Sequence, residues 1–405
     1  MKILFLTIGR FNSINDKGLY PDLLRALKND GNEVYIVSPV QKREKKKTEL
    51  IDENSSKLLK VKIGNITKCS IIEKGISTLM IKKHYKKAIK KYFNDISFDM
   101  IIYTTPPITL VGVVKYLKKK FKYKTYLLLK DIFPQNAIDI DILKKGLIYY
   151  YFRLKEKELY KISDRIGCMS QANVDYVLKH NSEINKDKVE ICPNSIEVID
   201  KSVKSNEKKY IREKYNIPLN KKVFIYGGNL GKPQGVSFII ECLKSQIKNK
   251  EIFFVIIGNG TEYSALEKYL LEEKQENVML MSTLPKEEYD QIVAACDVGL
   301  IFLDYRFTIP NFPSRTLGYM QAKLPILACT DKNTDVGDII EDNNCGWKCY
   351  SDDIKGFCEK VELIGNSEKK DLLKIGKNGF QYLKNNYSVE KCSKIITNAV
   401  SLLKK

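Results

Sequence analysis

The order of apolar and polar residues along the chain predicts alternating strands and helices. In the first half, six short apolar runs are rich in β-branched or aromatic residues and end at polar, glycine or proline turns: KILFLTI, EVYIVSP, MIIYTTP, TYLLLKDIF, RIGCMS and VEICPNS. Strands of a parallel sheet have such near-continuous apolar runs because helices cover both of its faces. The pattern therefore predicts an α/β fold.

The same alternation returns in the second half, after the polar and non-periodic passage 195–220. At 405 residues the chain is longer than one hydrophobic core usually covers. We expect two doubly wound domains, residues 1–197 and 198–385. A last helix within 386–405 is expected to cross back and pack on the first domain.

Two loops of the second half have features that suit a phosphate group. The first follows a strand in Val223–Gly235, VFIYGGNLGKPQG, and the second leads into a helix in Phe312–Ala328, FPSRTLGYMQAKLPILA. A glycine-rich turn lets backbone N–H groups approach an anion, and the positive end of the next helix favours its charge. Arg315, beside Ser314, adds a planar cation suited to a diphosphate. Together the loops favour a nucleotide-diphosphate ligand.

The net charge of +20 has two interpretations. In the first, a codon bias enriches Lys, Ile and Asn, and the lysine-rich faces are merely solvated. In the second, the lysines bind an anionic partner, either a nucleic acid or a membrane surface. Two segments mix lysines with aromatic residues, Lys82–Phe93 and Lys115–Lys124, which suits an anionic bilayer surface. No apolar run approaches the roughly 18 residues of a membrane-spanning helix. We expect a cytoplasmic protein, peripheral on the inner face of the membrane.

The chain resembles the GT-B glycosyltransferases, within the large retaining group called family 4. The resemblance runs over nearly the whole length and is carried by LLRALKNDGNEVYIVSP, IIGNGTEYSALEKYL and FPSRTLGYMQAKLPILA. KDIFPQNAIDI resembles a motif of bacterial enzymes that build capsules, O-antigens and exopolysaccharides. The resemblance implies two Rossmann-like domains facing across a cleft. It also implies transfer, with retention, from a nucleotide-diphosphate sugar, with UDP favoured, to a lipid-linked or saccharide acceptor.

Four glycines match donor-site glycines of the family. Gly18 matches the turn beneath the donor phosphates, and Gly228 follows the first strand of the second domain. Gly258 and Gly260 match the glycines of a further strand-end loop. Gly18, Gly258 and Gly260 are equally explained as turn residues.

The donor-phosphate cations depart from the family pattern. Asn229 stands where many relatives have an arginine, and Gln234 stands where they have a lysine. The resemblance therefore leaves Lys232 and Arg315, next to Ser314, as the cations expected to bind the diphosphate.

A second departure concerns two glutamates that contact the donor sugar and ribose in many relatives. Pro310 and Gly318 stand at those positions, and neither offers a polar side chain. Asp304, Asn311 or another polar group takes their place, or the donor is a deoxy or N-acetylated sugar that needs fewer hydroxyl contacts.

Asp131 is the candidate for acid–base catalysis or for orienting the acceptor, since it lies near the strand end where relatives often have a histidine. A helix-capping or structural carboxylate is an equally good interpretation. His84, in the basic helix, is interpreted as a surface residue. Asp139 and Asp141 form an Asp-x-Asp pair that holds a metal in a different, single-domain glycosyltransferase fold. In a loop of a two-domain chain it does not favour a metal site, and we expect no metal or other cofactor.

The aromatic run near residue 150 suggests a sugar-stacking surface or a core helix. A shared helical stripe favours packing in the core. Its members are Ile148, Tyr151, Phe152, Leu159 and Ile162.

Two other functions are considered. A UDP-N-acetylglucosamine 2-epimerase has the same two-domain fold, but it needs several titratable groups for proton abstraction, and the chain has two histidines. A basic nucleic-acid-binding protein would need a recognisable module with base-stacking aromatics, and none is found. We therefore expect no nucleic-acid partner.

Overall fold

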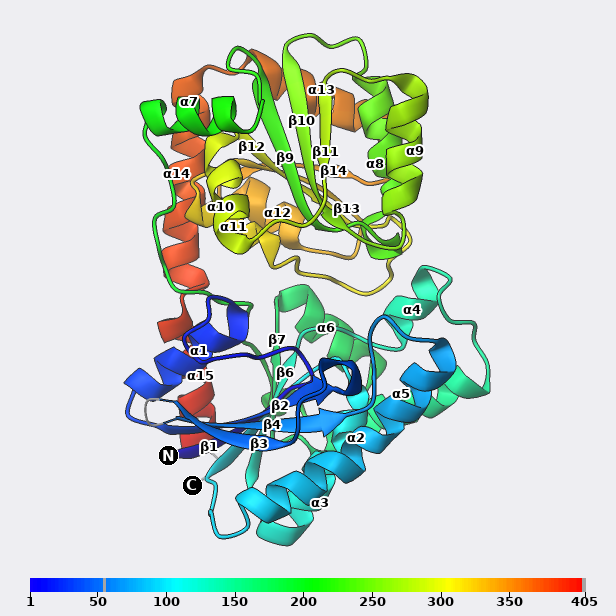
Figure 1. Ribbon diagram of the computed structural model, residues 1–405, viewed down its shortest axis with the longest axis vertical. Helices are drawn as coiled ribbons and strands as arrows, with labels where there is room; N and C mark the ends of the chain where they lie inside the picture. The colour runs from blue at the N-terminus through cyan, green and yellow to red at the C-terminus, as the bar shows by residue number, and fades with distance from the viewer. Residues whose placement is uncertain (54–55, 403–405) are drawn as a thin grey trace. The chain divides into compact units, whose positions relative to one another are not determined.

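In the computed structural model, which describes residues 1–53 and 56–402, the chain folds as two compact units (Figure 1). The first unit contains Met1–Ile138, Leu143–Glu197 and the chain from Val389 onward. The second contains Asp139–Ile142 and Val198–Ser388. The units therefore divide after residue 197.

The first unit is built on an eight-stranded sheet with the order β3-β4-β2-β1-β5-β6-β7-β8. Neighbouring strands pair in parallel except β3 and β4, which form an antiparallel edge. The strands are β1 (Lys2–Leu6), β2 (Glu33–Gln41), β3 (Glu49–Glu53), β4 (Ser56–Ile63), β5 (Met100–Thr104), β6 (Lys124–Leu129), β7 (Arg165–Cys168) and β8 (Val189–Ile191). β1 and β5 are buried along almost their whole length because helices cover both faces of the sheet.

Helices cover the two faces of this sheet in separate groups. Ile3 and Phe5 of β1 belong to one hydrophobic cluster with residues of α1 and α15. On another side of the unit, α2, α3 and α5 lie next to one another (Figure 1). The helices of the unit are α1 (Leu19–Asn29), α2 (Ile71–Tyr92), α3 (Val111–Phe121), α4 (Gln135–Asp139), α5 (Leu147–Ile162), α6 (Gln171–His180) and α15 (Val389–Leu402).

The second unit has a six-stranded parallel sheet with the order β11-β10-β9-β12-β13-β14. Its strands are β9 (Lys222–Asn229), β10 (Ile252–Asn259), β11 (Val278–Met281), β12 (Val298–Phe302), β13 (Ile326–Thr330) and β14 (Gly346–Tyr350). Its helices are α7 (Ser205–Lys214), α8 (Val236–Ser245), α9 (Tyr263–Glu273), α10 (Lys286–Ala295), α11 (Arg315–Gln321), α12 (Val336–Asp342), α13 (Ile354–Asn366) and α14 (Lys369–Asn386). Both halves thus have the predicted α/β architecture.

Strand order reverses at one point in each sheet. In the first sheet, β1 lies between β2 and β5, and in the second, β9 lies between β10 and β12. Crossover connections diverge at such a point and leave a crevice at the carboxyl ends of the strands. The loops that follow β1, β9 and β12 are therefore the expected ligand-binding loops of each unit.

Three details differ from the sequence-based expectation. The last helix begins at Val389 and residues 386–388 belong to the second unit, so the crossing starts later than predicted. Asp139–Ile142 is grouped with the second unit although it lies within the first domain of the sequence. The passage 195–220 contains α7, whose Ile211 and Arg212 are buried.

The predicted burial of α5 is wrong at its first turns. Leu147 and Ile148 are 90% and 61% exposed, and Tyr151 is exposed as well. Leu159, near the end of the helix, is buried as expected. The apolar residues do share one face of the helix, but only its last turns pack against the rest of the unit. The helical period predicts which face is apolar, but it does not predict which turns of the helix are covered by other elements.

In the described part of the chain, no helix combines the length and the apolar character needed to cross a bilayer.

Candidate functional site

Glycines bring two strand-end loops of the second unit together. β9 and β10 pair so that Gly228 lies opposite Gly258. A Cβ at Gly258 would overlap the carbonyl oxygen of Gly228, and a Cβ at Gly260 would overlap that of Leu230. Gly258 and Gly260 are therefore required by the close approach of the backbones, which is a sharper structural reason than the turn role considered from the sequence.

Gly228 itself lies in the open and next to a cation. It is exposed, and its φ of 138° favours glycine. A Cβ at this position would lie 3.1 Å from the guanidinium carbon of Arg315. The end of β9 and the start of α11, which lie far apart in the sequence, therefore form one small surface.

Arg315 is a half-buried cation with an unsatisfied nitrogen. Its guanidinium lies over the ring of Tyr226, with Cζ 4.3 Å from the ring centroid. Its Nη1 is buried and has no hydrogen-bond partner. Among the residues that the structure describes, no carboxylate forms an ion pair with Arg315. A buried donor without an acceptor is costly, so this position favours a ligand that accepts hydrogen bonds and carries negative charge.

Three tyrosines surround the cation: Tyr226, Tyr289 and Tyr319. The Tyr319 hydroxyl donates to the Ile225 carbonyl and accepts from the Gly227 N–H, both at 3.2 Å. Burial raises the pKa of Tyr289 to about 12, so its phenol is neutral near pH 7. Burial tends to lower the pKa of Arg315, but the tyrosine oxygens raise it above its ordinary value. The guanidinium therefore keeps its full charge among neutral groups.

The tyrosine cage around Arg315 could not be predicted from the sequence. Tyr226 lies inside a strand, and Tyr289 and Tyr319 lie on α10 and α11, where aromatic residues usually indicate core packing. No spacing pattern links the three, because the contact depends on how two helices pack beside β9.

The loop after β9 is polar and largely neutral. Asn229 Nδ2 donates to Gln234 Oε1 at 2.8 Å, so the two residues that replace the family's cations bind each other. Lys232 and Ser314 are exposed, and the Ser314 side chain makes no capping hydrogen bond to α11. α11 has seven residues, so the charge at this corner comes mainly from Arg315 rather than from the helix dipole.

Asp304 and Asn311, considered as substitutes for the missing glutamates, have structural partners. Asp304 pairs with Arg306 at 2.8 Å. The Asn311 N–H donates to Thr334 Oγ1, which in turn donates to Asp331 at 2.8 Å. Burial raises the pKa of Asp331 to about 6. The carboxylate of Asp304 is thus used inside the loop, while the Asn311 side chain has only a long contact, 3.5 Å, with the Ile309 carbonyl.

The positions of the two missing glutamates differ in their surroundings. Pro310 is buried, whereas a Cβ at Gly318 would have no heavy atom within 4 Å. The surface beside Gly318 is therefore open.

In the first unit, Gly18 caps α1 at the reversal point next to β1. Its φ of 155° lies in the range that favours glycine, and its N–H donates to Asp22 Oδ1 at 3.0 Å. Asp22 also pairs with Arg25 at 2.6 Å. Gly18 is therefore fixed by a local hydrogen-bond network and begins the helix at the carboxyl edge of the sheet.

Asp131 follows β6 at the same edge of that sheet. Its Oδ1 accepts a hydrogen bond from Asn136 Nδ2 at 2.7 Å, and its backbone N–H donates to Thr105 Oγ1 at 3.4 Å. Burial raises the pKa of Asp131 to about 6, although the hydrogen bonds from Ile132 and Asn136 oppose the shift. A carboxyl group with this pKa can give or take a proton near neutral pH.

The Asp-x-Asp pair, which belongs to the second unit, is hydrogen-bonded to other residues of that unit. Asp139 accepts hydrogen bonds from the backbone N–H and Oγ1 of Thr308, and Asp141 pairs with Arg306 at 2.7 Å. Within the described ranges, no group of three or more His, Cys, Asp or Glu side chains is placed to hold a metal ion.

The chain is similar to known glycosyltransferases in sequence and in fold. Residues 207–382, all in the second unit, match the family model "Glycosyl transferases group 1". The chain is 28% identical over 293 residues to the probable glycosyltransferase WbjE of Pseudomonas aeruginosa, covering 72% of this chain and 71% of WbjE. It is 25% identical over 208 residues to the putative colanic acid biosynthesis glycosyl transferase WcaI of Escherichia coli K12, covering 50% of this chain and 49% of WcaI.

A solved structure shares the fold over the full length. Anabaena Alr3699/HepE, in complex with UDP and glucose, superimposes with a TM-score of 0.70 at 13% identity, covering 99% of both chains. The predicted GT-B fold is confirmed by this likeness and by the two parallel-sheet units. Together with the group 1 match, the findings support a glycosyltransferase with relatives in polysaccharide biosynthesis.

Proposed function

We propose that this GT-B glycosyltransferase transfers a sugar from a UDP-sugar, with retention, to a lipid-linked saccharide in the synthesis of a bacterial surface polysaccharide. Two kinds of likeness support the proposal. WcaI is named for colanic acid biosynthesis, and HepE was solved with UDP and glucose.

The observation that carries the proposal is the unpaired cation at the end of β9. Arg315 has a buried Nη1 without a partner, and it lies beside the exposed backbone of Gly228. A diphosphate offers acceptor oxygens and negative charge, and it can lie against a glycine because no side chain intervenes. We assign the donor diphosphate to this position.

The neighbouring groups determine how strongly the diphosphate is bound. Asn229 and Gln234 are neutral, so Arg315 and the exposed Lys232 are the cations that we assign to it. As the bond to the sugar breaks, negative charge grows on the departing diphosphate. A cation fixed in a half-buried cage stabilises that charge more in the transition state than in the ground state. On this basis we propose a metal-independent reaction.

Asp131 is proposed to assist the acceptor. Its raised pKa of about 6 suits the transfer of a proton from an attacking hydroxyl group. The hydrogen bonds from Asn136 and from the Ile132 backbone hold the carboxylate group in a fixed orientation. The alternative, a purely structural carboxylate, predicts no change in the pH dependence of the rate when it is replaced.

A lipid-linked acceptor requires the enzyme to work at a membrane surface. α2 has lysines at six positions between 82 and 91, and α5 exposes Leu147, Ile148 and Leu154. Both helices contact the short helix η2 (Ile108–Leu110), so they lie on one side of the first unit. Lysines attract an anionic bilayer, and apolar side chains enter its interface. We propose peripheral binding to the cytoplasmic face.

Ligand-dependent thermal unfolding tests the donor assignment. At a UDP concentration about 100 times its Kd, the second unit should gain roughly 2.7 kcal/mol and its Tm should rise by about 5–10 °C. Transfer of radiolabelled sugar from UDP-sugars to a lipid extract then tests the reaction. A protein whose Tm is unchanged by every UDP-sugar and by UDP would refute the proposal.

A further inference from the structure

The first unit contains a cavity beside α2. It has a volume of about 580 Å³ and lies between the end of β4, the loop after β2 and α2. Its lining residues are Lys42, Thr48, Val61, Lys62, Ile63, Gly64, His84, Lys87, Ala88, Lys91 and Tyr92.

The floor of the cavity is apolar. Val61, Ile63 and Ala88 are buried, and they come from β4 and from the facing side of α2. Gly64 ends this strand beneath α2, where a Cβ would overlap Ser77. An apolar floor of this kind favours hydrocarbon over a hydrated ion.

The rim of the cavity is cationic. Lys42, Lys62, Lys87 and Lys91 are exposed, and they reach it from three separate elements. Within the part of the chain that the structure describes, none of the four forms an ion pair, and no carboxylate lines the cavity. Lysines elsewhere in the unit, such as Lys118 with Asp164 at 2.7 Å, do have acidic partners. The rim therefore has an uncompensated positive charge.

His84 lies in the wall between rim and floor. Its Nδ1 is buried and has no hydrogen-bond partner, so the ring is not committed to a contact inside the unit. Burial lowers the pKa of His84, and the nearby Lys83 and Lys87 lower it further. Lys62 and Lys42 face the same space from β4 and from the short helix η1 (Lys42–Glu44). An anion bound at this rim would oppose the lysines and raise the pKa of His84.

We propose that this cavity binds the phosphate end of a lipid, with the phosphoryl group on the lysine rim and the first carbons of its chain on the apolar floor. A phosphate ester of a hydrocarbon chain matches both the positive charge of the rim and the apolar side chains of the floor. Inorganic phosphate would leave the floor unused, and an uncharged chain would leave the lysines unpaired. The proposal does not depend on the identity of the donor.

Farnesyl phosphate, below its aggregation concentration, is a suitable probe. The chain has two histidines, so the His84 ring can be followed by NMR with His180 as an internal reference. His180 stacks on Tyr176, and its Nδ1 lies 2.9 Å from the Tyr176 carbonyl oxygen, on a helix outside the cavity. We expect farnesyl phosphate to shift the His84 signal and raise its pKa while His180 is unchanged. Farnesol and inorganic phosphate should each bind at least about tenfold more weakly, since each lacks one of the two contacts.

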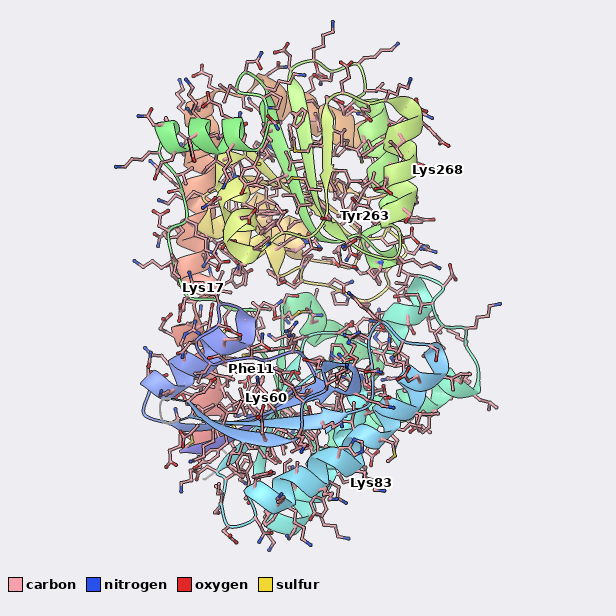
Figure 2. The ribbon with its side chains drawn as sticks, viewed as in Figure 1. Phe11, Lys17, Lys60, Lys83, Tyr263 and Lys268 are labelled. Atoms are coloured by element: carbon pink, nitrogen blue, oxygen red, sulfur yellow. The ribbon has the colours of Figure 1, made fainter. Side chains whose placement is uncertain are left out.

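Paired lysine variants separate a site from general electrostatics. Lys87→Gln with Lys91→Gln removes two charges from the rim, whereas Lys83→Gln with Lys90→Gln removes two charges from the same helix outside the lining. Lys83 is an exposed residue of α2 (Figure 2). The first pair should weaken farnesyl phosphate binding about 10- to 30-fold and the second less than about twofold. All four side chains are exposed, so neither pair should disturb folding.

Two results would overturn the proposal. Equal losses in the two paired variants would show that the charge of the helix, rather than a site, attracts the lipid. Equal affinity for inorganic phosphate and farnesyl phosphate would show a free-phosphate site. UDP-induced stabilisation, measured in the same variants, should be unchanged, so a failure here is distinguishable from a failure of the donor assignment.

Discussion

Replacing Arg315 by methionine separates a ligand-binding cation from a structural one. The substitution removes the guanidinium and keeps an unbranched apolar side chain over Tyr226. If Arg315 binds the donor diphosphate, the substitution should abolish UDP binding and leave the fold intact. If Arg315 instead stabilises the fold, the free energy of unfolding should fall.

The expected loss of binding follows from the contacts that the guanidinium can make. Hydrogen bonds to charged groups contribute about 1.5–3 kcal/mol each, and a diphosphate can accept one or two from Arg315. We therefore expect a loss of about 2–4 kcal/mol, which is roughly 30- to 900-fold in the Kd of UDP. The UDP affinity of Arg315→Lys should lie between those of the wild type and Arg315→Met, because an ammonium group keeps the charge but not the planar fork.

The expected change in stability is small because two effects oppose each other. Loss of the cation–π contact costs about 0.5–2 kcal/mol, and removal of the buried, unpaired Nη1 returns about 1–3 kcal/mol. Without UDP, the free energy of unfolding of Arg315→Met should either fall by less than about 1 kcal/mol or rise.

Arg212 provides the matched control in the same unit. Its Nε donates to the Ala295 carbonyl at 2.8 Å, and its Nη2 pairs with Asp297 at 2.7 Å. Its Nη1 also donates to the Pro218 and Lys221 carbonyls. Lys208 still pairs with Asp297 when Arg212 is replaced, so the cost comes mainly from the three carbonyls that lose their donor, at about 1–3 kcal/mol each. Arg212→Met should therefore destabilise the protein strongly, in contrast to Arg315→Met.

Urea unfolding and isothermal titration calorimetry with UDP give both quantities. We expect opposite profiles for the two arginines: binding lost with stability kept for Arg315, and stability lost for Arg212. Unchanged UDP affinity in Arg315→Met, or a destabilisation as large as that of Arg212→Met, would refute the assignment of Arg315 to the diphosphate.

Three further predictions test other parts of the structure. Gly258→Ala should destabilise the second unit by about 3 kcal/mol or more, since its Cβ meets the backbone of Gly228, whereas Gly318→Ala should stabilise by about 0.5–1 kcal/mol because the space is open; urea unfolding of both variants measures this, and equal effects would contradict it. With a folded pKa of about 6 for Asp131, the rate should rise with pH through 6 if the carboxylate is the base, and Asp131→Asn should remove that limb and lower turnover without changing UDP affinity; a variant with the wild-type pH profile would exclude the role. Leu147→Ser should weaken binding to anionic vesicles about tenfold in a flotation assay, because the side chain is 90% exposed in solution and would be buried in lipid, and undiminished binding would argue against α5 as the contact.

The sequence predicted the fold well because its signals are local. Apolar runs of strand length occur wherever the sheets are buried, and β5 and β12 are buried at every position. The prediction failed at the start of α5, where Ile148 and Tyr151 lie on an apolar stripe but remain largely exposed. A periodic stripe indicates a helix and one preferred face, whereas the extent of the covering surface is decided by other elements.

The site could be predicted only in part. The sequence singled out Gly228 and Arg315, and the structure brings them together, with a Cβ at Gly228 placed 3.1 Å from the guanidinium carbon. Asp304 was considered as a donor contact, but its carboxylate is taken by Arg306 two residues later. That ion pair depends on the conformation of the loop, which no residue pattern reports.

What the sequence determined by itself is the alternation of strands and helices, the division into two units, and the glycines and the arginine of two strand-end loops in the second unit. These features follow from period, composition and local turn chemistry, which are properties of residues near one another in the chain. Only the tertiary structure decided that Tyr226, Tyr289 and Tyr319 surround Arg315 and that lysines from three elements meet around one apolar floor. Such clusters arise where distant segments pack together, and the energy of an unpaired charge depends on that packing rather than on the residues beside it in sequence.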